Sequence, residues 1–185
     1  MVMKVMNGIV NDKENLIKDI SQAFKHRVYS DITFQLADGI CISTNKFMLA
    51  CRVPYFATML FGSLAEKLPS QPIPLKDCDS NVFKEILKFV WEAEVSLSDM
   101  QVPLLLEFLE TCRSFCLEEL VDTIVDHLRI LVNGNEVDFK DCLVALDFTE
   151  QHKFVRTSEL FIEYIDKTYQ AFPTLKSLGN CPNIR

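Results

Sequence analysis

Hydrophobic and polar residues alternate along residues 31–36, where every second position is apolar. This period of two predicts a β-strand with one buried face and one solvent-exposed face. Asp38-Gly39 follows as the tight turn of a hairpin, because these residues tolerate the positive backbone angles that such turns use. Ile40 and Ile42 carry the return strand. The apolar positions of the first strand are Ile32, Phe34 and Leu36.

A helix is predicted before the hairpin, over residues 14–25. Its apolar residues recur at helical spacing and share one face. That face must be covered either by the core of the same chain or by another subunit. The apolar residues of this face are Leu16, Ile17, Ile20 and Phe24.

Two helices are predicted directly after the hairpin. Residues 46–52 have the apolar density of a buried helix, and Pro54 starts a second helix. A side-chain oxygen can cap the N-terminus of the first of these helices. The candidate caps are Ser43, Thr44 and Asn45.

The following segment is an extended connector over residues 68–72, after which Ile73 and Leu75 mark a short strand. Asp79-Ser80 then caps a helix that we expect to end at Trp91. Its apolar residues recur at helical spacing, which predicts one buried face. These residues are Val82, Phe83, Ile86, Leu87 and Val90.

The C-terminal part of the chain is predicted to be helical. Gly134, which lies between two asparagines, marks a helix stop, and Asn135 is placed to cap the next helix. Residues 173–185 contain two prolines and a glycine, which favours a loose tail. The predicted helices begin at Pro103 and span residues 117–132, 137–150 and 155–169.

Composition is typical of a compact protein. The 185 residues are 49% hydrophobic, enough to bury one core and a smaller appended one. The net charge of −7 and the absence of a Lys/Arg cluster disfavour nucleic acid and anionic membrane as partners. No apolar run is long enough for a signal peptide or a membrane span. Seven scattered cysteines favour a reducing compartment, the cytoplasm or the nucleus.

The sequence contains no catalytic motif. No glycine pattern predicts a phosphate-binding loop, and the HExxH and GxSxG motifs are absent. Cys112 and Cys116 lie four residues apart, one helical turn, but without a CxxC motif or a nearby His they are predicted to pack rather than bind metal. We therefore expect no enzyme activity, no cofactor and no metal. The three histidines are isolated and are predicted to face solvent: His26, His127 and His152.

Residues 45–56 carry a family resemblance. In the BTB/POZ domain, a strand that begins with Asp and a hairpin are followed by His-Lys-x-x-Leu-Ala-x-Arg-Ser-x-Tyr-Phe, and here the segment is Asn-Lys-Phe-Met-Leu-Ala-Cys-Arg-Val-Pro-Tyr-Phe. The chain resembles this family over about residues 14 to 130, including 73–77, 82–87 and 105–109. Two departures are Asn45 in place of His and Trp91-Glu92-Ala93 in place of Tyr-Thr-Gly.

The resemblance implies an α+β fold, with a small β-sheet flanked by helical hairpins and followed by a helical extension similar to the start of a BACK domain. The implied boundaries are an N-terminal extension over residues 1–13, a BTB/POZ domain over 14–132, BACK-like helices over 135–172 and a tail over 173–185.

The resemblance also implies a dimer interface. It places Leu16, Ile20 and Met48 at dimer contacts, and it places Asp31 and Lys46 as a charged pair near them. A buried ion pair at such a position is expected to set the register of the interface more than to add stability. The alternatives are packing of the helix on its own core and a local salt bridge.

A second implied interface involves the scaffold protein cullin-3. Leu64-Ala65-Glu66 is similar to the hydrophobic-x-Glu motif by which BTB adaptors engage cullin-3, and Phe61 would face the same partner. An apolar side chain would enter a groove while the carboxylate orients it. The alternative is an ordinary loop that contains a Glu.

The function implied by the resemblance is a non-catalytic, homodimeric adaptor that binds cullin-3 and recruits substrates for ubiquitination. The alternative is a dimerisation scaffold that binds a transcriptional co-regulator or another partner without cullin. No kelch, MATH or zinc-finger pattern is visible, so the substrate protein is unknown. Three options remain: a longer protein, targets that bind these domains directly, or pairing with other BTB proteins.

Overall fold

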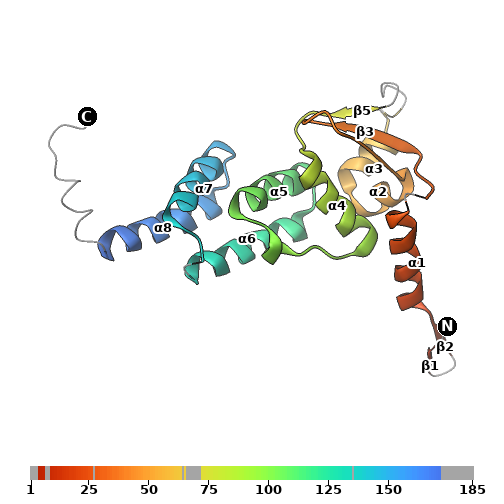
Figure 1. Ribbon diagram of the computed structural model, residues 1–185, viewed down its shortest axis with the longest axis horizontal. Helices are drawn as coiled ribbons and strands as arrows, with labels where there is room; N and C mark the ends of the chain where they lie inside the picture. Colours follow the sequence, from red (N-terminus) through yellow and green to blue (C-terminus); the bar gives the residue numbers. More distant parts are fainter. Residues whose placement is uncertain are drawn as a thin grey trace. The chain divides into compact units, whose positions relative to one another are not determined.

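The computed structural model describes residues 4–6, 9–26, 28–63, 65, 72–134 and 136–171 (Figure 1). The chain divides into two compact units. The first takes in the residues up to Val95 together with Ser114–Leu117, and the second takes in Ser96–Arg113 and the residues from Glu118 onward. The predicted α+β class, with a small sheet and a helical extension, is confirmed.

The first unit is built on a three-stranded sheet with the order β4-β3-β5. The central strand pairs antiparallel with β4 and parallel with β5, and its Phe34 lies opposite both Ile42 and Ile73. The predicted alternation is confirmed, because the apolar side chains of β3 are buried and Gln35 is exposed. The strands are β3 (Ile32–Leu36), β4 (Cys41–Thr44) and β5 (Ile73–Leu75).

The hairpin turn differs from the prediction in one respect. Gly39 has a φ of 82°, whereas Asp38 has no positive φ. The Asp38 carboxylate accepts a hydrogen bond from the Ile40 backbone N–H at 3.1 Å, which stabilises the turn through the side chain. Only one of the two turn residues therefore uses the left-handed region.

Helices α2 (Lys46–Arg52) and α3 (Pro54–Phe61) lie between β4 and β5 in the sequence, and α4 (Ser80–Glu92) follows β5. Of the three candidate caps for α2, Asn45 is the one used, since its side-chain oxygen accepts from the Met48 N–H at 3.1 Å. Asp79 caps α4 by accepting from the Asn81 N–H at 2.8 Å. Pro54 occupies the first turn of α3, where its missing N–H is tolerated.

Helix α4 ends one residue later than predicted, and Ala93 after it has a φ of 54° and a ψ of 27°. This left-handed conformation is the one that a glycine adopts without strain. Ala in place of the family's Gly therefore costs about 1 kcal/mol of stability. The Ala93 N–H still closes the helix by donating to the Phe89 carbonyl at 3.1 Å.

The core of the first unit is an aromatic cluster. The Phe34 ring lies 5.3 Å from the Phe56 ring and 5.7 Å from the Phe83 ring, and Phe115 lies 4.9 Å from Phe56, all measured between ring centroids. Edge-on and tilted contacts of this kind add to the stability gained from burying the rings. All four side chains are at most 5% exposed.

A short hairpin of β1 (Lys4–Met6) and β2 (Ile9–Asn11) precedes α1 (Lys13–Lys25). This hairpin was not among the predictions, although Asn7-Gly8 stands between the two strands in the sequence. Helix α1 contacts α4 at its C-terminal end, where Phe24 stacks on Trp91 with ring centroids 5.6 Å apart. Lys25 Nζ lies 3.7 Å from a carboxylate oxygen of Glu92 at the same end.

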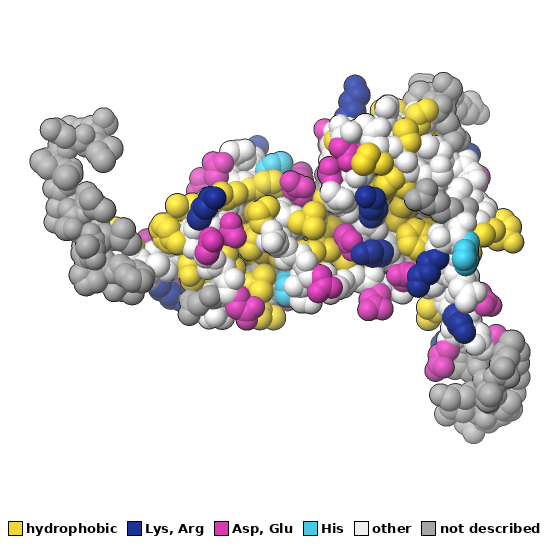
Figure 2. Space-filling model, in the orientation of Figure 1, with side chains coloured by type: hydrophobic (Ala, Val, Ile, Leu, Met, Phe, Trp, Pro, Cys, Tyr) yellow, Lys and Arg dark blue, Asp and Glu magenta, His cyan; other side chains and the backbone are white. Residues whose placement is uncertain are grey.

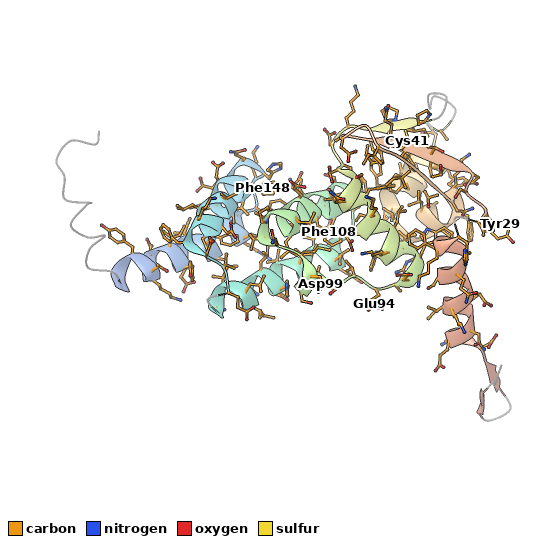
Figure 3. The ribbon with its side chains drawn as sticks, viewed as in Figure 1. Tyr29, Cys41, Glu94, Asp99, Phe108 and Phe148 are labelled. Atoms are coloured by element: carbon orange, nitrogen blue, oxygen red, sulfur yellow. The ribbon has the colours of Figure 1, made fainter. Side chains whose placement is uncertain are left out.

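The second unit is helical. Its largest buried side chains include Phe108, labelled in Figure 3, and Phe161, both 0% exposed. Tyr164 of α8 donates from its hydroxyl to the Val137 carbonyl at 3.2 Å, before the start of α7. Among the described residues, no helix is long and apolar enough to cross a bilayer. The elements are η2 (Leu97–Asp99), α5 (Val102–Ser114), α6 (Glu118–Asn133), α7 (Phe139–Gln151) and α8 (Val155–Ala171).

The ends of α6 and α7 differ in detail from the predictions. Helix α7 begins at Phe139 and not at Val137, and its cap is Asp138, which accepts from the Asp141 N–H at 2.7 Å. The predicted cap, Asn135, lies outside the described residues. Helix α6 does end next to Gly134, as predicted, but the φ of this glycine is not positive.

Truncation of the aromatic core is expected to destabilise the protein strongly. Phe83→Ala removes a fully buried ring and should lower the free energy of unfolding by about 3–5 kcal/mol. The matched control is Phe61→Ala, because that ring is 63% exposed and its loss should change stability by less than about 0.5 kcal/mol. Urea unfolding followed by circular dichroism measures both values. Equal losses would show that the ring cluster is not the core.

The cysteines are expected to differ sharply in reactivity. Cys142 is 0% exposed, and its burial, together with the charges of Asp138 and Asp141, raises the pKa of its thiol to about 11. At pH 8 this thiol stays protonated and should resist iodoacetamide in the folded protein. The exposed thiols should be alkylated under the same conditions, as mass spectrometry of the digested protein would show. These internal controls are Cys41, Cys51 and Cys116.

Candidate interaction surfaces

Helix α1 presents an apolar face that this chain does not cover. Leu16 is 58% exposed and Ile17 is 50% exposed, while Ile20 is partly exposed. No residue of α1 is buried. A helix of this length is marginal in water unless its apolar face packs on something. Among the described residues, α1 packs on α4 at its C-terminal end, through Phe24, and this contact does not cover Leu16 and Ile17.

Asp31, Asn45 and Lys46 form a local hydrogen-bonded junction between the start of β3 and the start of α2. The Lys46 backbone N–H donates to Asp31 Oδ1 at 2.8 Å, and Asn45 Nδ2 donates to the Tyr29 carbonyl at 2.9 Å. Asp31 is exposed in the single chain and Lys46 is partly exposed. Asn45 both caps α2 and holds the preceding loop, which gives the departure from His a structural role. Met48, the third residue of α2, is partly buried beside this junction.

The predicted cullin-binding residues are described only in part. Phe61 is the last residue of α3, and 63% of it is exposed. Leu64 and Glu66 lie outside the described residues. Gly62, which the sequence pattern did not single out, ends α3 with its Cα close to the Thr58 carbonyl. A Cβ at this position would lie 2.2 Å from the Thr58 carbonyl oxygen. Any larger residue at Gly62 would therefore displace the segment that carries Phe61.

The first unit also contains a groove of about 300 Å³ that the sequence pattern did not predict. It is bordered by the C-terminal end of α1, by strand β4 and by one side of α4. Its lining comes from three separate segments, residues 23–30, 40–44 and 84–91. Cys41, labelled on the sheet in Figure 3, is an exposed residue of its rim.

In the second unit, Arg113 of α5 holds the turn between α7 and α8. Its guanidinium donates to the His152 carbonyl at 2.8 Å, pairs with Glu110 at 2.6 Å and lies 4.0 Å from the centroid of the Phe154 ring. His152 also stacks on Phe148, with ring centroids 4.2 Å apart. The prediction that His152 simply faces solvent is wrong, because the ring is held between Phe148 and Glu110.

The other two histidines differ in exposure. His26 is exposed, as predicted, but His127 is only partly exposed and its Nε2 is buried without a hydrogen-bond partner among the described residues.

Cys112 is buried within α5, whereas Cys116 lies beyond the end of that helix with a φ of 59°. The two thiols therefore do not share a helix face. In the described parts of the chain, no group of His, Cys, Asp and Glu side chains could hold a metal ion.

Exposed apolar residues occur on the second unit as well, where Figure 2 shows hydrophobic side chains among the charged ones. Leu143 and Val144 of α7 are 46% and 49% exposed, and Ile130 of α6 is 64% exposed. Both units thus present apolar surface of the kind that mediates protein contacts.

Comparisons with known proteins agree with this picture. A structure of the BTB (Tramtrack and Bric a brac) domain of human gigaxonin aligns with a TM-score of 0.52 at 20% identity, covering 68% of this chain and 99% of that one, which shows the fold. Human BTB/POZ domain-containing protein 9 is 30% identical over 109 residues, which are 59% of this chain and 18% of that protein. BTB/POZ and MATH domain-containing protein 3 of Arabidopsis thaliana is 23% identical over 194 residues, which are 96% of this chain and 45% of that protein.

The chain thus spans less than half the length of these two curated relatives. The sequence also matches the BTB/POZ domain family over residues 20–129, which is more than half of the chain. The family is a protein-interaction fold, in agreement with the exposed apolar surfaces of both units. The chain belongs to the BTB/POZ domain family.

Proposed function

We propose that this protein is a non-catalytic, homodimeric adaptor that binds cullin-3 and recruits substrate proteins for ubiquitination. The observation that carries the proposal is the exposure of Phe61 at the end of α3, directly before the Leu64-Ala65-Glu66 motif. An exposed aromatic side chain, followed in the sequence by an apolar residue and a carboxylate, supplies groups that could anchor and orient a partner protein.

Dimerisation would use the apolar face of α1, with Leu16, Ile20 and Met48 in contact with the second copy. Burying Leu16 and Ile20 across a two-fold axis would remove apolar surface from water. Each Å² buried stabilises the dimer by about 25 cal/mol. Asp31 and Lys46 would lie near this interface, where the hydrogen bond between them fixes the start of α2. The interface therefore accounts for a helix face that the chain itself leaves exposed.

The proposed location is the cytoplasm or the nucleus. None of the six described cysteines forms a disulfide, and three of them are exposed. Exposed thiols persist without forming disulfides in a reducing compartment. The partners proposed are a second copy or another BTB protein, cullin-3 and an unidentified substrate. One relative carries a MATH domain in its name, so a longer form of this protein with a separate target-binding region is one arrangement that fits the proposal.

The α1 interface is tested by mutation of two residues one helical turn apart. Leu16→Asp combined with Ile20→Asp should convert the dimer into a monomer, because two carboxylates cannot be desolvated in an apolar interface. The matched control is Lys18→Asp combined with Gln22→Asp, which places two carboxylates at the same spacing on exposed positions of α1. Light scattering after size-exclusion chromatography measures the mass. A wild-type monomer, or a control that also dissociates, would contradict the interface.

The cullin site is tested by Leu64→Asp in the full chain. This change should weaken binding of the cullin-3 N-terminal domain by more than about 30-fold, as expected for loss of an interface anchor, while the dimer stays folded. Ile40→Asp is the control, since it makes the same change at an apolar residue of the β3–β4 turn that is 47% exposed. Calorimetric titration measures the affinity.

Three outcomes of this experiment separate the functions. One cullin bound per wild-type chain supports the adaptor. A wild-type dimer that ignores cullin favours the alternative, a scaffold that binds a co-regulator or another partner through its BTB surfaces. Unfolding of the Leu64→Asp variant would contradict the assignment of Leu64 to an exposed site.

A further inference from the structure

The groove beside β4 follows the free edge of the sheet. In the order β4-β3-β5, β4 pairs with β3 on one side, and no described strand pairs with its other side. All residues from Ile40 to Thr44 line the groove. A run of consecutive residues, whose side chains alternate between the two faces, can line one groove only if the groove runs along the strand edge. The backbone of β4 is therefore accessible from the groove.

The bottom of the groove is apolar and fixed in position. Leu87 is 2% exposed and Trp91 is 8% exposed, and Trp91 is held between the ring of Phe24 and the hydroxyl of Thr44, to which its indole N–H donates at 3.4 Å. Val28 at the opening is 39% exposed. A preformed apolar floor with an open rim accepts a large aliphatic or aromatic side chain without rearrangement.

The charged residues described in the lining of the groove are both lysines. Among the described residues, the lining contains Lys25 and Lys84 and no Asp or Glu, although the chain as a whole has a net charge of −7. Lys84 Nζ contacts the neutral side-chain oxygen of Asn81 at 3.4 Å, so no described carboxylate neutralises it. Lys25 is 68% exposed and its contact to Glu92 is long, at 3.7 Å. A partner of opposite charge is therefore favoured.

We propose that this groove binds an extended acidic peptide segment of another protein, which adds as a strand to the free edge of β4. Backbone hydrogen bonds to β4 supply affinity, an apolar side chain of the peptide packs on Leu87 and Trp91, and a carboxylate pairs with Lys84 or Lys25. The groove lies within one chain and away from Leu64 and Glu66 in sequence. Binding there does not depend on the proposed cullin contact.

A short edge strand can also exist simply because it is too short to attract other chains. Three features of this edge go beyond that explanation. The groove is apolar at its base, it has a volume of about 300 Å³, and its rim is basic in an acidic protein. Charge complementarity also argues against a second copy as the occupant, because two identical basic rims repel each other.

The experiment uses the full chain and the peptide fluorescein-Asp-Val-Asp-Phe-Asp-Val-Asp as the probe. Fluorescence anisotropy should show saturable binding, and a peptide with Lys in place of each Asp should not bind. Lys84→Glu should weaken the acidic probe by about tenfold, because an attractive charge pair becomes a repulsive one. The control is Lys76→Glu, the same charge change at an exposed residue that does not line the groove, and it should leave the affinity unchanged.

Hydrogen–deuterium exchange locates the bound probe. Binding should slow exchange of the backbone amides of residues 40–44 in the wild type and not in Lys84→Glu. Equal binding of the acidic and the basic peptide, an unchanged affinity in Lys84→Glu, or protection confined to other segments would overturn the proposal. Amides of residues 40–44 that are protected without the peptide and become exposed on dilution to monomer would assign the edge to a second copy instead.

Discussion

The packing of Phe34 against Phe56 and Phe83 joins the central strand of the sheet to α3 and α4. This packing positions the sheet edge, the end of α3 and the groove side of α4. The free edge of β4 is one strand away from Phe34, the exposed end of α3 follows Phe56 by one and a half helical turns, and the groove residues of α4 follow Phe83. Because the ring contacts leave little room for adjustment, a shift at any one ring would move an interaction surface as well as the core.

Much of the first unit could be predicted because its signals are local. Period-two alternation identified β3, and Asn45 and Asp79 act as caps within three residues of the N–H groups that they bind. The left-handed Ala93 was also foreseeable, since a glycine usually occupies that position in the family. By contrast, the β1–β2 hairpin was missed although the sequence carries Asn7-Gly8, a dipeptide typical of two-residue hairpin loops, between the two strands. His152 was misplaced because its surroundings come from Glu110 and from Phe148, which no local pattern brings together with it.

The candidate surfaces also differ in how far the sequence could predict them. The apolar face of α1 was visible in the sequence, and the exposure of Leu16 and Ile17 agrees with a face that needs a partner. The groove beside β4 could not be predicted, because Phe24, Ile42 and Trp91 meet only after the sheet and two helices have formed. The two lysines at the groove could not be predicted either, because the net charge of −7 is a sum over the whole chain and does not report local charge.

The position of Phe115 in the sequence affects how the aromatic cluster can form during translation. This residue belongs to a short segment, Ser114–Leu117, that returns to the first unit after the chain has already contributed Ser96–Arg113 to the second. Its ring contacts Phe56 and Tyr55, so a nascent chain that has not yet released Phe115 from the ribosome exposes an open side of its hydrophobic cluster. Neither unit corresponds to one continuous stretch of translated sequence. The two units are therefore expected to fold late and in an interdependent order, a stage at which chaperones would bind the emerging polypeptide.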